Sequence, residues 1–89
     1  MSTQKEIIFR KHARERMIER NITHEEVKKA VEEGVKIEEI KHKRIRAICE
    51  VEEGRFVTVG YSETRKYRVI NTAFESGNTD IELYRRLKK

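Results

Sequence analysis

The chain has 89 residues, of which 42% are charged and 36% hydrophobic, and it carries a formal net charge of +5. This length provides one domain with a modest core, so we expect a functional site on the surface or in a shallow groove. The single cysteine excludes an internal disulfide and a zinc cluster made of cysteines. The absence of an apolar run of roughly 18 residues, or of a signal-peptide stretch, predicts a cytoplasmic protein without a membrane partner.

The positive charge is concentrated in three segments. Residues 10–20 hold five basic and two acidic side chains, residues 41–46 read K-H-K-R-I-R, and the last residues read Y-R-R-L-K-K, whereas residues 25–39 are rich in glutamate. A net charge of +5 by itself indicates only good solubility. If the basic segments lie together in the fold, they form a binding surface for a polyanion. The many charges and the lack of proline are also compatible with a thermophilic source.

The first part of the sequence predicts a short strand and two helices. E-I-I-F at 6–9 reads as an edge strand or a lead-in, and residues 12–21 place apolar side chains at helical spacing. Thr23 and Glu26 form a capping box that begins a second helix. We expect this helix to end at Gly34 in the left-handed conformation.

From residue 35 onward the apolar side chains alternate with a period of two, which is typical of strands. The expected strands are 35–37, 44–51, 55–61 and 67–74. A hairpin with Gly54 at positive φ connects the second and third of these strands. Cys49 is expected to be a buried structural thiol. A second capping box, Thr79 with Glu82, begins a C-terminal helix. The sequence thus predicts an α+β fold, with two N-terminal helices on an antiparallel four-stranded meander.

His12, Arg16 and Arg20 are four residues apart, so they form a gently drifting row on one face of the first helix. Like charge from two guanidinium groups disfavours a protonated imidazole, which suits His12 to accepting a proton. In the alternative interpretation, His12 packs at the helix start, and the arginines pair with Glu15, Glu19 or the glutamate-rich second helix. The sequence leaves both interpretations open.

The other two histidines point less clearly to a function. His24 begins the second helix beside two glutamates and is expected to be solvated, while His42 lies in a basic turn that suits contact with a phosphate backbone. No spacing of histidines and carboxylates is typical of a metal site, so we expect no metal and no cofactor.

The pattern H-A-x-x-R-M-x-x-R-x-I, followed by T-x-E-E-V and the expected meander, resembles the domain-of-unknown-function family 4258. Residues 69–74 occupy the closing strand of that family, with Thr72 in its usual place. These small bacterial and archaeal proteins are similar to BrnT and, more distantly, to RelE and ParE toxins. The resemblance implies a single RelE-like domain over residues 1–89. The helix motif matches at His12, Ala13, Arg16, Met17, Arg20 and Ile22.

The resemblance also implies a chemistry, because RelE-like toxins cut mRNA, usually on the ribosome, by driving the ribose 2′-hydroxyl into the adjacent phosphate. This reaction needs a proton acceptor, cations around the phosphate and an acid for the leaving oxygen, but no metal. His12 or a tyrosine (Tyr61, Tyr67) would transfer protons. The candidate catalytic residues are His12, Arg16, Arg20 and Tyr67. The candidate nucleic-acid contacts are the basic residues Lys41, Lys43, Arg44, Arg46, Arg65 and Arg68.

Two functions therefore fit the sequence. The first is a toxin-like, metal-independent endoribonuclease that acts on RNA or the ribosome and has a small antitoxin protein as its partner. The second is a non-catalytic module of the same fold that binds nucleic acid or protein. A site on the sheet face away from the first two helices would exclude His12, and would be centred on Arg46, Tyr67, Arg68 and Thr72.

Overall fold

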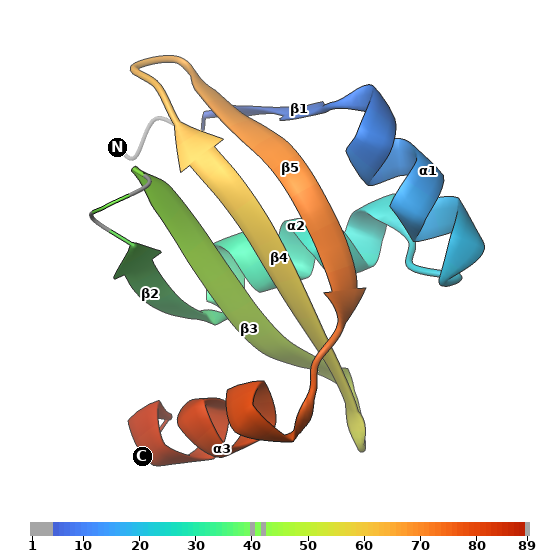
Figure 1. Ribbon diagram of the computed structural model, residues 1–89, viewed down its shortest axis with the longest axis vertical. Helices are drawn as coiled ribbons and strands as arrows, with labels where there is room; N and C mark the ends of the chain where they lie inside the picture. Colours follow the sequence, from blue (N-terminus) through green and yellow to red (C-terminus); the bar gives the residue numbers. More distant parts are fainter. Residues whose placement is uncertain (1–4, 40, 42, 89) are drawn as a thin grey trace.

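The computed structural model describes residues 5–39, 41 and 43–88, which form three helices and a five-stranded sheet (Figure 1). This architecture confirms the predicted α+β class and the predicted order of elements. None of the described helices is long and apolar enough to cross a membrane. In chain order the elements are β1 (Glu6–Phe9), α1 (Lys11–Glu19), α2 (His24–Glu33), β2 (Val35–Glu39), β3 (Arg44–Glu52), β4 (Arg55–Glu63), β5 (Tyr67–Glu75) and α3 (Asn78–Leu87).

The sheet has the strand order β1-β5-β4-β3-β2 and is mixed. Strands β2 to β5 pair antiparallel as expected, but the predicted four-stranded sheet is wrong because β1 adds a fifth strand that runs parallel to β5. Glu6 lies opposite Tyr67 in this pairing, and Phe9 lies opposite Ile70. Strand β1 docks at this edge because its Ile7 and Phe9 side chains pack against the main core. A run of four residues is too short for the sequence pattern to show which strand it pairs with.

The main core lies between the sheet and the two N-terminal helices, and α2 crosses behind the strands in Figure 1. Ala47, Cys49 and Val51 share this face of β3, as their alternation predicts. Burial raises the pKa of the Cys49 thiol, which fits the expected structural role. The buried residues of this cluster are Ala13, Met17, Ile22, Val27, Ala30, Val31, Ala47, Cys49, Val51, Val57, Val59, Tyr61, Ile70 and Ala73.

The opposite face of the sheet is only partly covered. A second, smaller cluster forms there around Ile48, Phe56 and Tyr84, where α3 packs against one end of the strands. The rings of Phe56 and Tyr84 meet edge to face, with centroids 5.3 Å apart. In Figure 1, α3 lies below the strands, and no described helix lies over the rest of this face. The fold thus leaves a broad part of the sheet open to ligands.

Asp80 fixes the position of α3. The predicted capping box of Thr79 and Glu82 is wrong, because α3 begins at Asn78 without a side-chain cap, and Thr79 lies inside its first turn. The Asp80 carboxylate instead turns inward, where it accepts hydrogen bonds from Arg46 Nη1 at 2.8 Å and from Thr58 Oγ1 at 2.9 Å. These bonds tie the first turn of α3 to strands β3 and β4.

The start of α2 is as predicted, and so is its end at Gly34, but the conformation of that glycine is not. Thr23 Oγ1 accepts a hydrogen bond from the Glu26 backbone N–H, and the Glu26 carboxylate accepts one from the Thr23 N–H, which completes the capping box. Gly34, however, has an extended backbone with φ of −72° rather than the expected left-handed one. A Cβ at position 34 would lie 2.4 Å from the Ala30 carbonyl oxygen and 2.7 Å from that of Ile48. A glycine is required here by the close approach of backbone atoms.

We therefore expect Gly34→Ala to lower the free energy of unfolding by about 2 kcal/mol or more, because both obstructing atoms belong to the backbone. The matched control is Gly77→Ala, where a Cβ would meet nothing within 4 Å. For the control we expect a change below about 1 kcal/mol. Urea unfolding followed by circular dichroism measures both, and equal stabilities would contradict the close-packing argument.

Candidate functional site

The uncovered part of the second sheet face, called the open face below, is built by alternate residues of the three central strands. Arg46 lies opposite Gly60, and Gly60 lies opposite Thr72, so these three residues cross the sheet in one row. Because side chains two residues apart share a face, further positions of the same strands point the same way. The open face comprises Arg44, Arg46, Gly60, Thr72 and Phe74, and Thr58 lies buried beside them on the same side of β4.

A shallow cavity of about 240 Å³ lies on the open face. Strand β3 contributes Arg44 and Arg46 to its lining, and Glu39 on β2, which pairs with Arg44 in the register, is a third charged residue there. An adjoining depression is lined by Glu38, Glu39, Lys43, Arg44 and Ile45, so this end of the cavity, with two acidic and two basic residues, continues toward the start of β3. The lining residues of the cavity are Glu39, Arg44, Arg46, Thr58, Gly60, Asn71, Thr72 and Phe74.

A β-bulge in β5 shapes one wall of the cavity. The register passes from Thr72 opposite Gly60 directly to Ile70 opposite Tyr61, so Asn71 is an extra residue. In a regular strand, neighbouring residues point to opposite faces, but here Asn71 and Thr72 both line the cavity. Bulges that redirect side chains in this way are over-represented next to functional sites. The Asn71 amide nitrogen donates a hydrogen bond to Ser62 Oγ at 3.0 Å.

Arg46 belongs both to the cavity and to the structural network beneath α3. Its Nη1 bonds to Asp80, and Thr58, which also bonds to Asp80, lies 2.6 Å from the Ser76 hydroxyl. Arg46 Nε is buried and has no hydrogen-bond partner among the described residues. The network therefore holds this guanidinium in one orientation, with part of its hydrogen-bonding capacity unused.

The predicted row of His12, Arg16 and Arg20 lies elsewhere. All three side chains are exposed, those of His12 and Arg16 on α1 and that of Arg20 at its C-cap, and α1 packs on the face opposite the cavity. His12 is 90% exposed in its side chain, and its Nδ1 lies 3.7 Å from a carboxylate oxygen of Glu15. His12 therefore does not pack at the helix start as the alternative interpretation expects, and the sheet separates this row from the open face.

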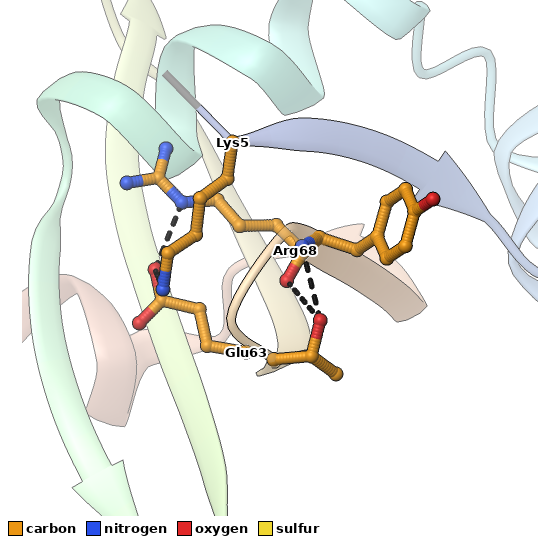
Figure 2. Close-up of polar contacts among 5 residues, drawn as sticks. Lys5, Glu63 and Arg68 are labelled. Carbon is orange, nitrogen blue, oxygen red and sulfur yellow. Dashed lines mark hydrogen bonds and ion pairs between the residues drawn. The ribbon is translucent and has the colours of Figure 1, made fainter. Parts of the chain in front are cut away.

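Two further predicted site residues, Tyr67 and Arg68, begin β5, and their side chains point to opposite faces of the sheet. Arg68 Nε donates to Glu63 Oε2 at 3.0 Å, and Lys5 Nζ lies 3.5 Å from the same oxygen, as Figure 2 shows. This cluster joins the β4–β5 hairpin to the residue before β1. Tyr67, which is partly exposed, lies on the other side of the strand, at the margin of the open face.

The remaining candidates are divided between turns and core. Lys41 and Lys43 are exposed in the turn before β3, where Lys43 has a φ of 53°, and Arg65 is exposed in the β4–β5 loop. His42 lies outside the described residues. Tyr61 is only 1% exposed and belongs to the main core. Desolvation raises the pKa of its hydroxyl, which makes Tyr61 unsuited to proton transfer at the surface.

Sequence reasoning thus found Arg44, Arg46 and Thr72 but missed several residues of the site. Glu39 belongs to the glutamate-rich segment 25–39, and Asp80 lies between Thr79 and Glu82 of the expected capping box, so the sequence pattern marks neither as a site residue. The segment R-F-V-T-V-G-Y carries a signal, because Thr58 and Gly60 interrupt the bulky apolar residues that follow Arg55. Among the residues that the structure describes, no three His, Cys, Asp or Glu side chains gather to hold a metal ion.

The cluster of Glu63, Arg68 and Lys5 generates a prediction for stability against pH. The hydrogen bond from Arg68, with a smaller effect of Lys5, lowers the pKa of Glu63 below its ordinary value. A carboxylate with a lowered pKa stabilises the fold above its unfolded-state pKa of about 4.3, and this stabilisation is lost as the pH falls through the lower, folded-state value.

We expect Glu63→Gln to melt at a lower temperature than the native chain at pH 6, with the difference shrinking below about pH 4. The control is Glu53→Gln, at an exposed position in the β3–β4 turn. Differential scanning calorimetry between pH 2.5 and pH 7 is the measurement. A difference between Glu63→Gln and the native chain that stays constant with pH would contradict the role of the Arg68 bond.

The model of the family described as "Domain of unknown function (DUF4258)" matches residues 9–75, and the chain belongs to this family. The matched segment includes β3, β4 and β5, which carry most of the cavity. The chain matches no curated protein and no solved structure at a significant level.

Proposed function

We propose that this member of the DUF4258 family binds single-stranded RNA across the open face of its sheet. The observation that carries the proposal is the cavity in which Arg44 and Arg46 meet polar groups of β4 and β5 on an uncovered sheet face. Guanidinium groups suit phosphate because they offer paired donors in a fixed plane. Lys43, beside Arg44, adds a further cation in the adjoining depression, which Glu38 and Glu39 also line. The backbone of an RNA strand would follow these basic side chains.

The proposal assigns different roles to the two arginines. Arg44 is exposed and is free to follow a phosphate, whereas Arg46 is held by Asp80 and presents a fixed positive charge. Replacing Arg46 would also leave the buried Asp80 carboxylate without its cation, which destabilises the fold. Arg44 is therefore the position at which binding can be tested without disturbing α3.

We expect Arg44→Gln to weaken the binding of a short single-stranded RNA by about tenfold, and to reduce the slope of log affinity against log salt by about 0.7 for each lost phosphate contact. The matched control, Arg16→Gln, removes the same charge from α1 and should leave affinity and slope close to native. Fluorescence anisotropy between 50 and 300 mM salt is the measurement. A larger effect of Arg16→Gln would move the binding surface to the helix layer.

A second candidate function is the metal-independent endoribonuclease implied by the RelE-like resemblance. The observation that favours it is that Glu39, a carboxylate, lines the same cavity as Arg44 and Arg46. In this arrangement Glu39 would take the proton of the ribose 2′-hydroxyl as that oxygen bonds to the phosphorus, and the arginines would neutralise the charge that builds on the phosphate. The P–O5′ bond would break, and the leaving 5′-oxygen would take a proton from water. The ribosome or free mRNA would supply the substrate, and an antitoxin protein would act by covering the open face.

Cleavage of RNA in the presence of EDTA tests this second function. We expect the native chain and His12→Ala to cut a labelled RNA at similar rates, and Glu39→Gln to cut at least about 100-fold more slowly. Gel electrophoresis of the products, which should carry 2′,3′-cyclic phosphate ends, is the measurement. If the native chain binds RNA and leaves it intact, the protein is a non-catalytic binding module. If His12→Ala loses cleavage, the catalytic group lies on α1 and not on the open face.

A further inference from the structure

Gly60 occupies an unusual place for a glycine. It lies within β4, the central strand of the sheet, beside the register shift at Gly60/Tyr61. A glycine weakens a strand and often marks a bulge or the close approach of a ligand. Gly54 is the glycine with positive φ among the described residues, so backbone conformation does not account for Gly60. A Cβ at position 60 would meet one atom within 4 Å, the Thr72 Cγ2 at 3.0 Å. The space above Gly60 is otherwise open and forms part of the cavity.

The walls around Gly60 combine flat apolar surface with hydrogen-bonding groups. Phe74 contributes an aromatic side chain, and the bulge brings Asn71 and Thr72 to the same side. The bond from Asn71 to Ser62 uses one N–H of the carboxamide, which leaves a second N–H and an oxygen for another partner. Asparagine side chains pair with the edges of bases through these two groups. At about 240 Å³ the cavity is smaller than the roughly 300–1,000 Å³ of sites for drug-sized ligands.

We propose that this cavity is a pocket for one nucleobase, which lies over the bare backbone of Gly60 with its polar edge toward Asn71. The inference rests on the proposed RNA binding and adds its ligand chemistry: a base in the cavity and a neighbouring phosphate on Arg44. The absence of a side chain at position 60 provides the floor on which a planar ring can lie. A larger residue there would occupy the volume that the base requires.

A competing explanation is that Gly60 only makes room for Thr72, and a pair of variants separates the two. Thr72→Ser removes Cγ2, the one atom that a Cβ at position 60 would meet, and it keeps the hydroxyl group. The double variant Gly60→Ala with Thr72→Ser therefore places a methyl group in the cavity without a clash in the fold. Thr72→Ser alone is its matched reference, and thermal melting confirms that both are folded.

Two probes report base and phosphate binding separately: a ten-nucleotide single-stranded RNA and inorganic polyphosphate, which has no bases. We expect the double variant to bind the RNA about tenfold more weakly than Thr72→Ser, with polyphosphate binding unchanged. Asn71→Ala, which removes the polar edge and leaves Gly60 intact, should show the same selective loss. Arg44→Gln should weaken both probes.

Equal RNA binding by the double variant and Thr72→Ser would overturn the pocket, as would an equal loss for RNA and polyphosphate. If the double variant does not fold, Asn71→Ala provides the test: a loss of RNA binding with unchanged polyphosphate binding supports the pocket, and any other result overturns it. The failure of the proposed function is distinguishable, because it would appear as an unchanged affinity of Arg44→Gln for RNA. If the native chain does not bind the RNA at all, both proposals fall.

Discussion

The Asp80 carboxylate is the constraint on which the second face of the sheet depends. It is almost fully buried, so its charge requires the Arg46 guanidinium and the Thr58 hydroxyl as partners. Because Asp80 lies in the first turn of α3, these bonds hold that helix at one end of the strands. The apolar contacts around Phe56 and Tyr84 complete the attachment. The rest of the face stays uncovered, and the same network fixes Arg46 at the rim of the cavity.

The sheet separates two basic surfaces that the sequence could not place relative to each other. The row on α1 lies in the layer that supports the core, and its histidine pairs with a neighbouring glutamate. Arg44 and Arg46 lie on the opposite face, beside the polar groups of β4 and β5. Exposed charge on a helix is common in soluble proteins and contributes mainly to solubility. Basic residues that line a cavity beside a β-bulge point more specifically to a binding site, and they are the basis of the proposed RNA site.

The sequence predicted those features that arise from local periodicity and local hydrogen bonds. The alternation of Ala47, Cys49 and Val51 and the capping box of Thr23 and Glu26 are confirmed because nearby residues determine them. The parallel pairing of β1, the close packing at Gly34 and the bulge at Asn71 depend on backbones that meet only in the folded chain. The role of Asp80 could not be predicted for the same reason, because its hydrogen-bond partners are 22 and 34 residues away in the sequence.

The most direct test of the central claim is to map RNA contacts by amide chemical shifts in a ¹⁵N-labelled protein. On addition of a short single-stranded RNA, the account predicts that the largest shifts fall on the open face, at Arg44, Gly60, Asn71 and Thr72, and that α1 changes little. Shifts concentrated at His12, Arg16 and Arg20, with the open face unchanged, would contradict it.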